Sequence, residues 1–242
     1  IPIGSLGIGT WAWGDRWIWG YGGSYTGADV EAAFQAGIAG NIRFFDTAEV
    51  YGLGSSERLL GKFIRMAGKS AVVGTKFAPY PWRWQRGDLV RALRRSLERL
   101  EMERIDLYQV HWPISPVSIE TWMEAMADAV EAGLVRAVGV SNYNVEQMRR
   151  AHVVLARRGM ALASNQVEYS LLARNPERTG LIQACRDLRV TFIAHTPLAQ
   201  GLLTGKYTPE NPPRGLLRRL RYRSRRLASI KPLITLLREI GH

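Results

Sequence analysis

Four side chains that could carry acid–base chemistry stand at or just after the ends of apolar segments: Asp46, Tyr51, Lys76 and His111. Asp46 closes the apolar run that ends at Phe45, and Tyr51 follows five positions later. A lysine at the inner end of a strand is costly without a counter-charge, and Asp46 is the obvious partner for Lys76. A fixed ammonium beside Tyr51 should lower the pKa of the phenol from its ordinary value near ~10 and prepare it for general acid–base work.

Each of these residues also has an ordinary structural interpretation. Asp46 could cap backbone amides, Tyr51 could be a loop aromatic, and His111 could be a satisfied core histidine. Taken one at a time, these interpretations compete well with the chemical one. Four such groups at the ends of successive strands are much harder to explain by accident, so their shared position favours chemistry.

The elements that must position these residues alternate along the whole chain. Apolar runs bounded by turns predict seven strands, and stretches with helical periodicity follow them with mostly short connections. Such alternation demands a parallel sheet, because each helix returns the chain to the start of the next strand. The strands are expected at residues 5–13, 42–45, 71–76, 105–110, 135–140, 162–167 and 190–194, and the clearest helices at 119–131, 145–158, 176–188 and 227–240.

The glycine pattern of the first turn decides between two parallel α/β architectures. Gly7 and Gly9 are followed by Thr10, Trp11 and Ala12, so the third glycine of a dinucleotide-binding G-x-G-x-x-G turn is absent. The sequence therefore predicts a single domain over residues 1–242 with a (β/α)8 TIM-barrel fold. In such a barrel the active face is made by residues just past the strand ends, which adds Ser141, Asn142, Gln166 and His195 to the same face.

Composition excludes several other classes of protein. One cysteine rules out an intramolecular disulfide framework, no apolar run reaches the length of a membrane span, and we expect no metal site. The formal charge of +12 comes from 33 Lys and Arg against 21 Asp and Glu. Much of the excess positive charge lies in one stretch of arginines that has no aromatic residues placed regularly between them. A solvated or phosphate-facing surface is therefore favoured over a nucleic-acid groove. Its residues are Arg214, Arg218, Arg219, Arg221, Arg223, Arg225 and Arg226.

At this point the chain resembles the aldo-keto reductase superfamily. Asp46, Tyr51, Lys76 and His111 are similar to its catalytic tetrad. The segments around them resemble the family in the same order along almost the whole chain. Their sequences are most similar to the branch of plant-plastid and bacterial members that includes pyridoxal-reductase-like enzymes. These segments are GTW at 9–11, FDTAEVYG at 45–52, DLY at 106–108, GVSNY at 139–143, NQVEYS at 165–170 and TPLAQGLLTGK at 196–206.

The resemblance implies an NADP(H)-dependent reductase that converts aldehydes or ketones to alcohols. Tyr51 would protonate the carbonyl oxygen, Lys76 and Asp46 would tune that proton, and His111 would position the carbonyl. The expected cofactor-binding residues are Thr10, Trp11, Asp46, Ser141, Asn142, Gln166, His195, Thr196, Pro197, Leu198, Ala199, Gly201 and Lys206. The expected walls of the substrate pocket are Trp13, Trp82, Trp84 and Trp112.

Two features depart from the family pattern. The residue before Thr196 is usually an aromatic that stacks on the nicotinamide, and here it is His195, so we expect weaker cofactor binding with a mild pH dependence. The eighth strand and its helix, which carry the pocket for the 2′-phosphate, are not found before His242. Preference for NADP is therefore implied by the family alone.

A second functional hypothesis is a cofactor-sensing regulatory subunit, like the family's potassium-channel partners, which keep the tetrad but turn over slowly. No membrane or partner motif supports it. We expect a small-molecule carbonyl substrate, no nucleic-acid or membrane partner, and a cytoplasmic location, or the plastid stroma if the source is a plant or alga.

Overall fold

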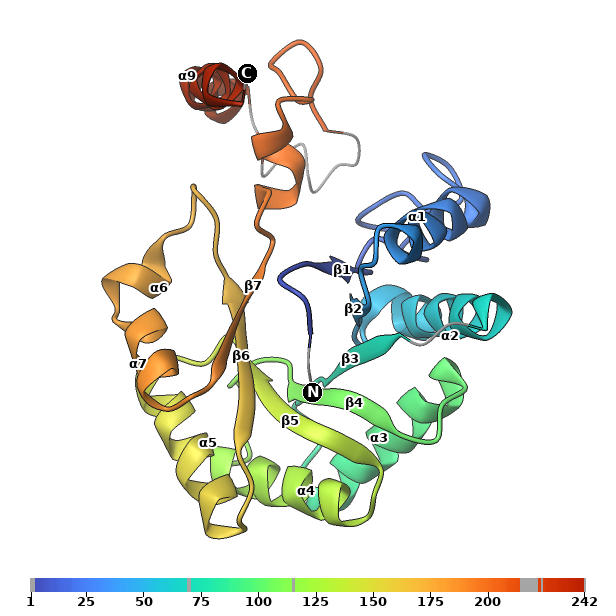
Figure 1. Cartoon of the computed structure of the whole chain (residues 1–242), viewed down its shortest axis with the longest axis vertical. Coiled ribbons are helices and arrows are strands. Elements are labelled where there is room, and N and C mark those ends of the chain that lie inside the picture. The colour runs from blue at the N-terminus through green and yellow to red at the C-terminus, as the bar shows by residue number, and fades with distance from the viewer. Residues whose placement is uncertain (1–2, 69–70, 115, 214–221, 223, 242) are drawn as a thin grey trace.

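The structure is a computed structural model that describes residues 3–68, 71–114, 116–213, 222 and 224–241. Seven parallel strands form one sheet in sequence order, from β1 to β7, and the sheet curves into a nearly closed barrel (Figure 1). The strands are β1 Gly7–Gly9, β2 Phe44–Asp46, β3 Val72–Phe77, β4 Ile105–Val110, β5 Val135–Ser141, β6 Leu162–Glu168 and β7 Thr191–His195.

Helices connect successive strands and lie outside the barrel (Figure 1). The regular helices are α1 Gly27–Ala39, α2 Ser55–Ala67, α3 Arg86–Leu100, α4 Ile119–Glu131, α5 Val145–Arg157, α6 Asn175–Arg178, α7 Leu181–Asp187 and α9 Ser224–Ile240. Two short 3₁₀ segments, η1 Tyr51–Gly54 and η2 Ala199–Thr204, follow β2 and β7.

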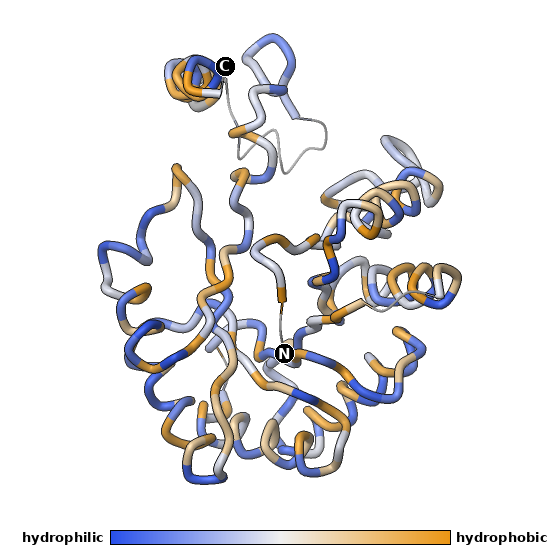
Figure 2. Tube along the Cα trace, viewed as in Figure 1, coloured by the Kyte–Doolittle hydropathy of each residue, from blue (hydrophilic) through white to orange (hydrophobic). Residues whose placement is uncertain are grey.

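The main core lies between the strands and the inner faces of the helices. Every residue of β4 is buried, and α3 buries Leu89, Leu93, Leu97 and Leu100 at helical spacing against the sheet. Hydrophobic and hydrophilic stretches alternate along the helices, as expected where one face meets the barrel and the other meets solvent (Figure 2). This core fixes the strands, and thereby the residues at their carboxyl ends.

The predicted fold class is confirmed, and several boundaries differ from the prediction. The first strand covers only Gly7–Gly9 of the expected residues 5–13, because the chain turns immediately after Thr10. The helix expected at 176–188 is divided into α6 and α7 at Gly180, whose φ of 71° a regular helix does not tolerate. The helices at 119–131 and 145–157 begin and end as expected, within one residue.

The barrel is open on one side. Among the residues that the structure describes, no strand lies between β7 and β1, in agreement with the missing eighth strand. Beyond this opening, α9 packs on η2 through a small apolar cluster of Leu202, Tyr222, Leu227 and Ile230, separate from the main core.

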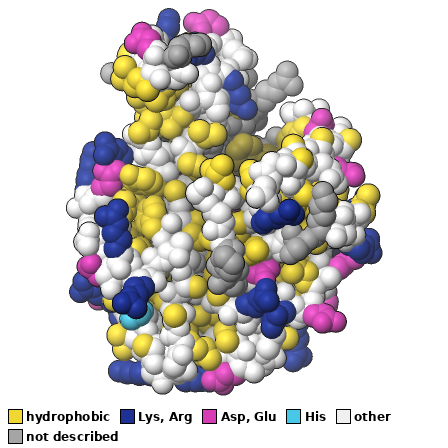
Figure 3. Space-filling view, in the orientation of Figure 1, with side chains coloured by type: hydrophobic (Ala, Val, Ile, Leu, Met, Phe, Trp, Pro, Cys, Tyr) yellow, Lys and Arg dark blue, Asp and Glu magenta, His cyan; other side chains and the backbone are white. Residues whose placement is uncertain are grey.

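Most of the predicted arginine cluster lies outside the described residues, so the expectation of no nucleic-acid partner stays a prediction. Lys and Arg side chains are scattered over the face shown in Figure 3, among hydrophobic and acidic side chains. In the predicted arginine cluster, Arg214, Arg218, Arg219, Arg221 and Arg223 lie outside the described residues, and the side chains of Arg225 and Arg226 are not described. Of the helices that are described, none combines the length and apolar character that crossing a membrane requires.

Candidate active site

A cavity of about 650 Å³ opens where the carboxyl ends of the strands meet. Its wall contains residues at or just after the carboxyl ends of six of the seven strands, so it gathers segments far apart in the sequence. The lining residues are Gly9, Trp11, Ala12, Asp15, Ile18, Trp19, Asp46, Val50, Tyr51, His111, Trp112, Ser141, Asn142, Gln166, Glu168, His195, Thr196, Pro197, Leu198 and Gln200.

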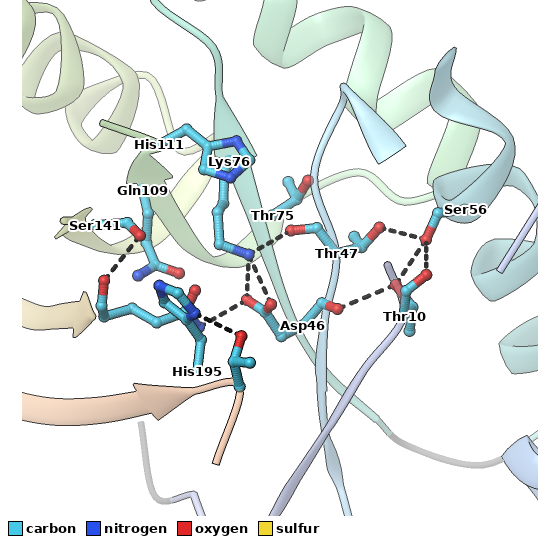
Figure 4. Close-up of polar contacts among 12 residues, drawn as sticks. Thr10, Asp46, Thr47, Ser56, Thr75, Lys76, Gln109, His111, Ser141 and His195 are labelled. Atoms are coloured by element: carbon cyan, nitrogen blue, oxygen red, sulfur yellow. Dashed lines mark hydrogen bonds and ion pairs between the residues drawn. The ribbon is translucent and has the colours of Figure 1, made fainter. Parts of the chain in front are cut away.

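Lys76 and Asp46 form the expected pair at the floor of this cavity (Figure 4). The Lys76 ammonium lies 2.6 Å from both carboxylate oxygens of Asp46 and donates a third hydrogen bond to the Thr47 carbonyl at 2.9 Å. Only 1% of Lys76 is exposed. Burial alone would lower the pKa of Lys76, but the charge of Asp46 and the hydrogen bonds that Lys76 donates more than offset it and raise the pKa. Lys76 is therefore a fixed cation.

Tyr51 lies directly beside this cation, but its pKa shifts opposite to the prediction. The Lys76 ammonium is 5.2 Å from the centre of the Tyr51 ring, and the ring stacks on Trp11. Burial raises the pKa of Tyr51, and the lowering effect of Lys76 does not overcome burial and the opposing charge of Asp46. The expected lowering of the Tyr51 pKa was wrong, because the depth of burial cannot be read from the sequence. Tyr51 is a protonated phenol at neutral pH.

The His111 ring packs edge-on against the Tyr51 ring, with the two ring centres 5.7 Å apart. Burial, and then the charges of Lys76 and His195, lower its pKa to about 2. The imidazole is therefore neutral, and its buried Nδ1 has no hydrogen-bond partner among the described residues. A neutral imidazole can donate one hydrogen bond to a bound oxygen without giving up its proton.

The ends of β5, β6 and β7 form a connected polar network. Asn142 donates to the His111 carbonyl at 3.0 Å and to Ser141 Oγ at 3.1 Å, and Ser141 donates to the Gln166 carbonyl at 2.8 Å. Gln166 Nε2 also donates to Asp46 Oδ1 at 3.0 Å. The network therefore joins the predicted amide-binding residues to the Lys76–Asp46 pair (Figure 4).

His195 completes this network. Its Nε2 lies 3.1 Å from Asn142 Oδ1, and its Nδ1 lies 3.0 Å from Thr196 Oγ1. Because Asn142 uses its amide nitrogen elsewhere, Nε2 carries the proton and Nδ1 accepts from Thr196. Burial, followed by the charge of Lys76, lowers the pKa of His195. The imidazole is neutral at physiological pH, so the pH dependence expected of cofactor binding stays a prediction for pH values below neutrality.

Thr10 was expected to bind cofactor but lies behind the cavity wall. Its hydroxyl is fully buried, donates to the Asp46 carbonyl at 3.0 Å and lies 2.6 Å from Ser56 Oγ. Ser56 also contacts Thr47 Oγ1 at 2.9 Å and donates to the Thr10 carbonyl at 2.9 Å. Three hydroxyls thus tie the ends of β1 and β2 to the start of α2, which holds Asp46 in place (Figure 4).

Only one of the four tryptophans expected in the substrate pocket lines the cavity. Trp112 does so, next to His111. Trp13 is 6% exposed and packs in the core against Phe45 and Phe63, because the chain turns after β1 and points it inward. Trp82 and Trp84 are 68% and 62% exposed on the loop after β3, outside the cavity wall.

The segment expected along the cofactor pyrophosphate divides in the same way. Thr196, Pro197 and Leu198 line the cavity, whereas Ala199, Gly201 and Lys206 do not. Lys206 is exposed, with its ammonium 5.0 Å from the Tyr207 ring centre. Its contact with a pyrophosphate stays a prediction.

Sequence reasoning missed the loop after β1. Asp15, Ile18 and Trp19 all line the cavity, and Gln200 lines it from the η2 side. The only sequence signal was their position between the first strand and the first helix, where a barrel places its active-face loops. No group of His, Cys, Asp and Glu arranged to hold a metal ion is found within the described part of the chain.

Fold and site together define an α/β-barrel protein with a buried Lys–Asp pair, a tyrosine and a histidine gathered at the carboxyl ends of its strands. Residues 5–241 match the model of the aldo/keto reductase family, and the chain belongs to this family of oxidoreductases. It is 40% identical over 254 residues to the chloroplastic pyridoxal reductase of Arabidopsis thaliana, covering 100% of this chain and 69% of that protein. It is 39% identical over 245 residues to an uncharacterized oxidoreductase of Mycobacterium tuberculosis, covering 99% and 72%.

Solved structures agree with this assignment. A thermostable aldo-keto reductase bound to the inhibitor epalrestat superposes with a TM-score of 0.72 at 32% identity, covering 82% of this chain and 70% of the other. An aldo/keto reductase of Klebsiella pneumoniae in complex with NADP and acetate gives a TM-score of 0.70 at 32% identity, covering 82% and 66%.

Proposed function

We propose that this chain is an NADP(H)-dependent reductase of aldehydes or ketones, with Tyr51 as general acid. The observation that carries the proposal is the buried Lys76–Asp46 pair beside Tyr51, whose ring packs edge-on against neutral His111 in the wall of one cavity. A protonated phenol next to a fixed cation can give its proton to a carbonyl oxygen, because the ammonium stabilises the phenolate that remains.

The residues present fit a nicotinamide cofactor. When bound, the reduced nicotinamide supplies the hydride. Ser141, Asn142 and Gln166 offer a hydroxyl and two amides at one wall of the cavity, which matches the donors and acceptors of a carboxamide. His195 presents a neutral ring to the same wall, suited to stacking. Asn142 and Gln166 would exchange their present contacts with His111 and Asp46 for contacts with the ligand.

The remaining steps belong to the chain itself. His111 would donate a hydrogen bond to the carbonyl oxygen and hold it near the Tyr51 hydroxyl. Tyr51 would then protonate that oxygen, while Lys76 stays charged and Asp46 stays ionised against it. Trp11 and Trp112, which line the cavity, would exclude water from the reacting atoms.

Substitution of Tyr51 by Phe tests this role. Tyr51→Phe removes the proton but keeps the ring between Trp11 and His111, so NADPH affinity should change by less than about twofold. Loss of a general acid should lower kcat by roughly 10²–10⁴-fold. The measurements are NADPH oxidation with a panel of aldehydes and NADPH titration by fluorescence. Retained turnover in the variant would contradict the role of Tyr51.

The same assay separates catalysis from a cofactor-sensing regulatory role. Tight NADPH binding by the wild-type chain without measurable oxidation by any aldehyde or ketone would favour the regulatory subunit. Turnover that depends on Tyr51 would favour the reductase.

A further inference from the structure

Asp15 is a buried carboxylate that the proposed mechanism does not use. It lies on the loop after β1, lines the cavity and is only 7% exposed. One of its oxygens, Oδ1, accepts a hydrogen bond from the Ile18 backbone amide at 2.7 Å. Within the described residues no ion pair joins Asp15 to a lysine, arginine or histidine. The Asp15 side chain is therefore largely withdrawn from solvent without an ion-pair partner, an arrangement that proteins rarely keep without use.

Its position is close to the reacting groups. The Gly14–Asp15 backbone abuts the turn that carries Tyr51: a Cβ added to Gly52 would lie 2.9 Å from the Gly14 carbonyl and 3.2 Å from the Asp15 nitrogen. The two loops are thus in direct contact, and both belong to the wall of one cavity. A substrate held at Tyr51 and His111 would therefore occupy the same cavity that Asp15 lines.

The rest of the wall on this side is aromatic and apolar. Trp11, Ile18, Trp19, Val50 and Trp112 line the cavity, and Trp11 meets Trp19 edge-on with ring centres 5.5 Å apart. Indole faces attract cations through their negative quadrupole, most strongly where water is excluded. Because a carboxylate and several indole rings line the same cavity, both kinds of side chain favour binding of an organic cation there.

We propose that Asp15 is a specificity-determining residue that selects carbonyl substrates carrying a positively charged ammonium or pyridinium group. This inference rests on the proposed carbonyl reductase function and deepens it. The carbonyl of the substrate is placed at Tyr51 and His111, and its cationic group lies against Asp15 and the indole faces.

A matched pair of substrates tests the charge alone. 4-(Trimethylammonio)benzaldehyde and 4-tert-butylbenzaldehyde have the same shape, and only the first is permanently charged. Asp15→Asn keeps an oxygen to accept from the Ile18 amide and removes the charge. In this variant kcat/KM for the charged aldehyde should fall about tenfold more than kcat/KM for the neutral one. An equal loss for both aldehydes would show a structural role for Asp15 and overturn the proposal.

Glu168 provides a control, because it is a second carboxylate of the cavity wall but is exposed. Glu168→Gln should change kcat/KM for the two aldehydes by the same factor. The same selective loss as in Asp15→Asn would show a diffuse negative potential in place of recognition by Asp15, and would overturn the proposal.

Binding without turnover separates this inference from the proposed function. Phenyltrimethylammonium should quench the tryptophan fluorescence of the chain, and its Kd should rise about tenfold in Asp15→Asn. An unchanged Kd overturns the role of Asp15 even if aldehydes are reduced. A raised Kd without any aldehyde reduction supports the cation site and refutes the reductase.

Discussion

At the scale of single residues, the pKa of Tyr51 sets how activity depends on pH. A general acid works while it is protonated, and a raised pKa keeps Tyr51 protonated to higher pH. We therefore expect kcat/KM for aldehyde reduction to stay within about twofold between about pH 6 and pH 9, and to fall only above the ordinary phenol value near ~10. Lys76, whose pKa is raised, and His111, whose pKa is lowered to about 2, add no titration in that window. A decline beginning near neutrality would show instead that the bound cofactor lowers the Tyr51 pKa.

The Lys76–Asp46 pair makes a second prediction about residues. Asp46→Asn leaves the buried Lys76 ammonium without its counter-charge, so the free energy of unfolding should fall by about 3–5 kcal/mol. Urea or thermal denaturation measures this. Glu120→Gln is a control that breaks the exposed Glu120–Arg150 ion pair, which solvent screens, so its effect should be much smaller. Equal effects of the two substitutions would mean that burial of Lys76 is not maintained in solution.

These residues also mark what the sequence could and could not predict. The pairing of Lys76 with Asp46 was predictable, because both lie near the carboxyl ends of parallel strands, and these ends share one edge. The direction of the Tyr51 pKa was not, because it depends on how desolvation compares with two opposing charges. Trp11 and Trp13 are two positions apart and were both assigned to the site, yet only Trp11 lines the cavity. The turn after Gly9 points Trp11 to the cavity and Trp13 to the core, and a turn of this kind has no periodic pattern of residues by which the sequence could reveal it.

At the scale of elements, the contact between the β1 loop and η1 depends on Gly52. Its φ is +54°, and an added Cβ would lie 2.9 Å from the Gly14 backbone. Gly52→Ala should therefore destabilise the fold by roughly 1–3 kcal/mol and lower kcat/KM, because relief of the clash displaces Asp15 or Tyr51. Gly68→Ala is a matched control with a φ of +56° and open space around it.

The two glycine variants separate backbone strain from close approach. Gly68→Ala should show only the strain of a left-handed residue in its melting temperature and should leave aldehyde reduction unaffected. If Gly52→Ala were no more harmful than Gly68→Ala by both measurements, the two loops would not be in firm contact. From the sequence, Gly52 could be predicted only to interrupt regular secondary structure. Its contact with the Gly14–Asp15 backbone becomes visible only in the folded chain.

At the scale of the whole molecule, the β1–β7 opening predicts uneven stability around the barrel. Within the described residues, β1 and β7 are each paired on one side only, and neither contains a fully buried residue. β4 is paired on both sides and buried throughout. Amides of β1 and β7 should therefore exchange hydrogen at least about tenfold faster than those of β4, because edge strands open with little loss of buried surface. Hydrogen-exchange mass spectrometry of the chain measures this strand by strand.

Protection of β7 equal to that of β4 would require a partner for its free edge. Since β7 ends in His195 and leads into Thr196 and Pro197, such a partner would also steady the cofactor side of the cavity. Fast exchange of β7 should then slow when NADPH binds, while exchange in β4 stays the same.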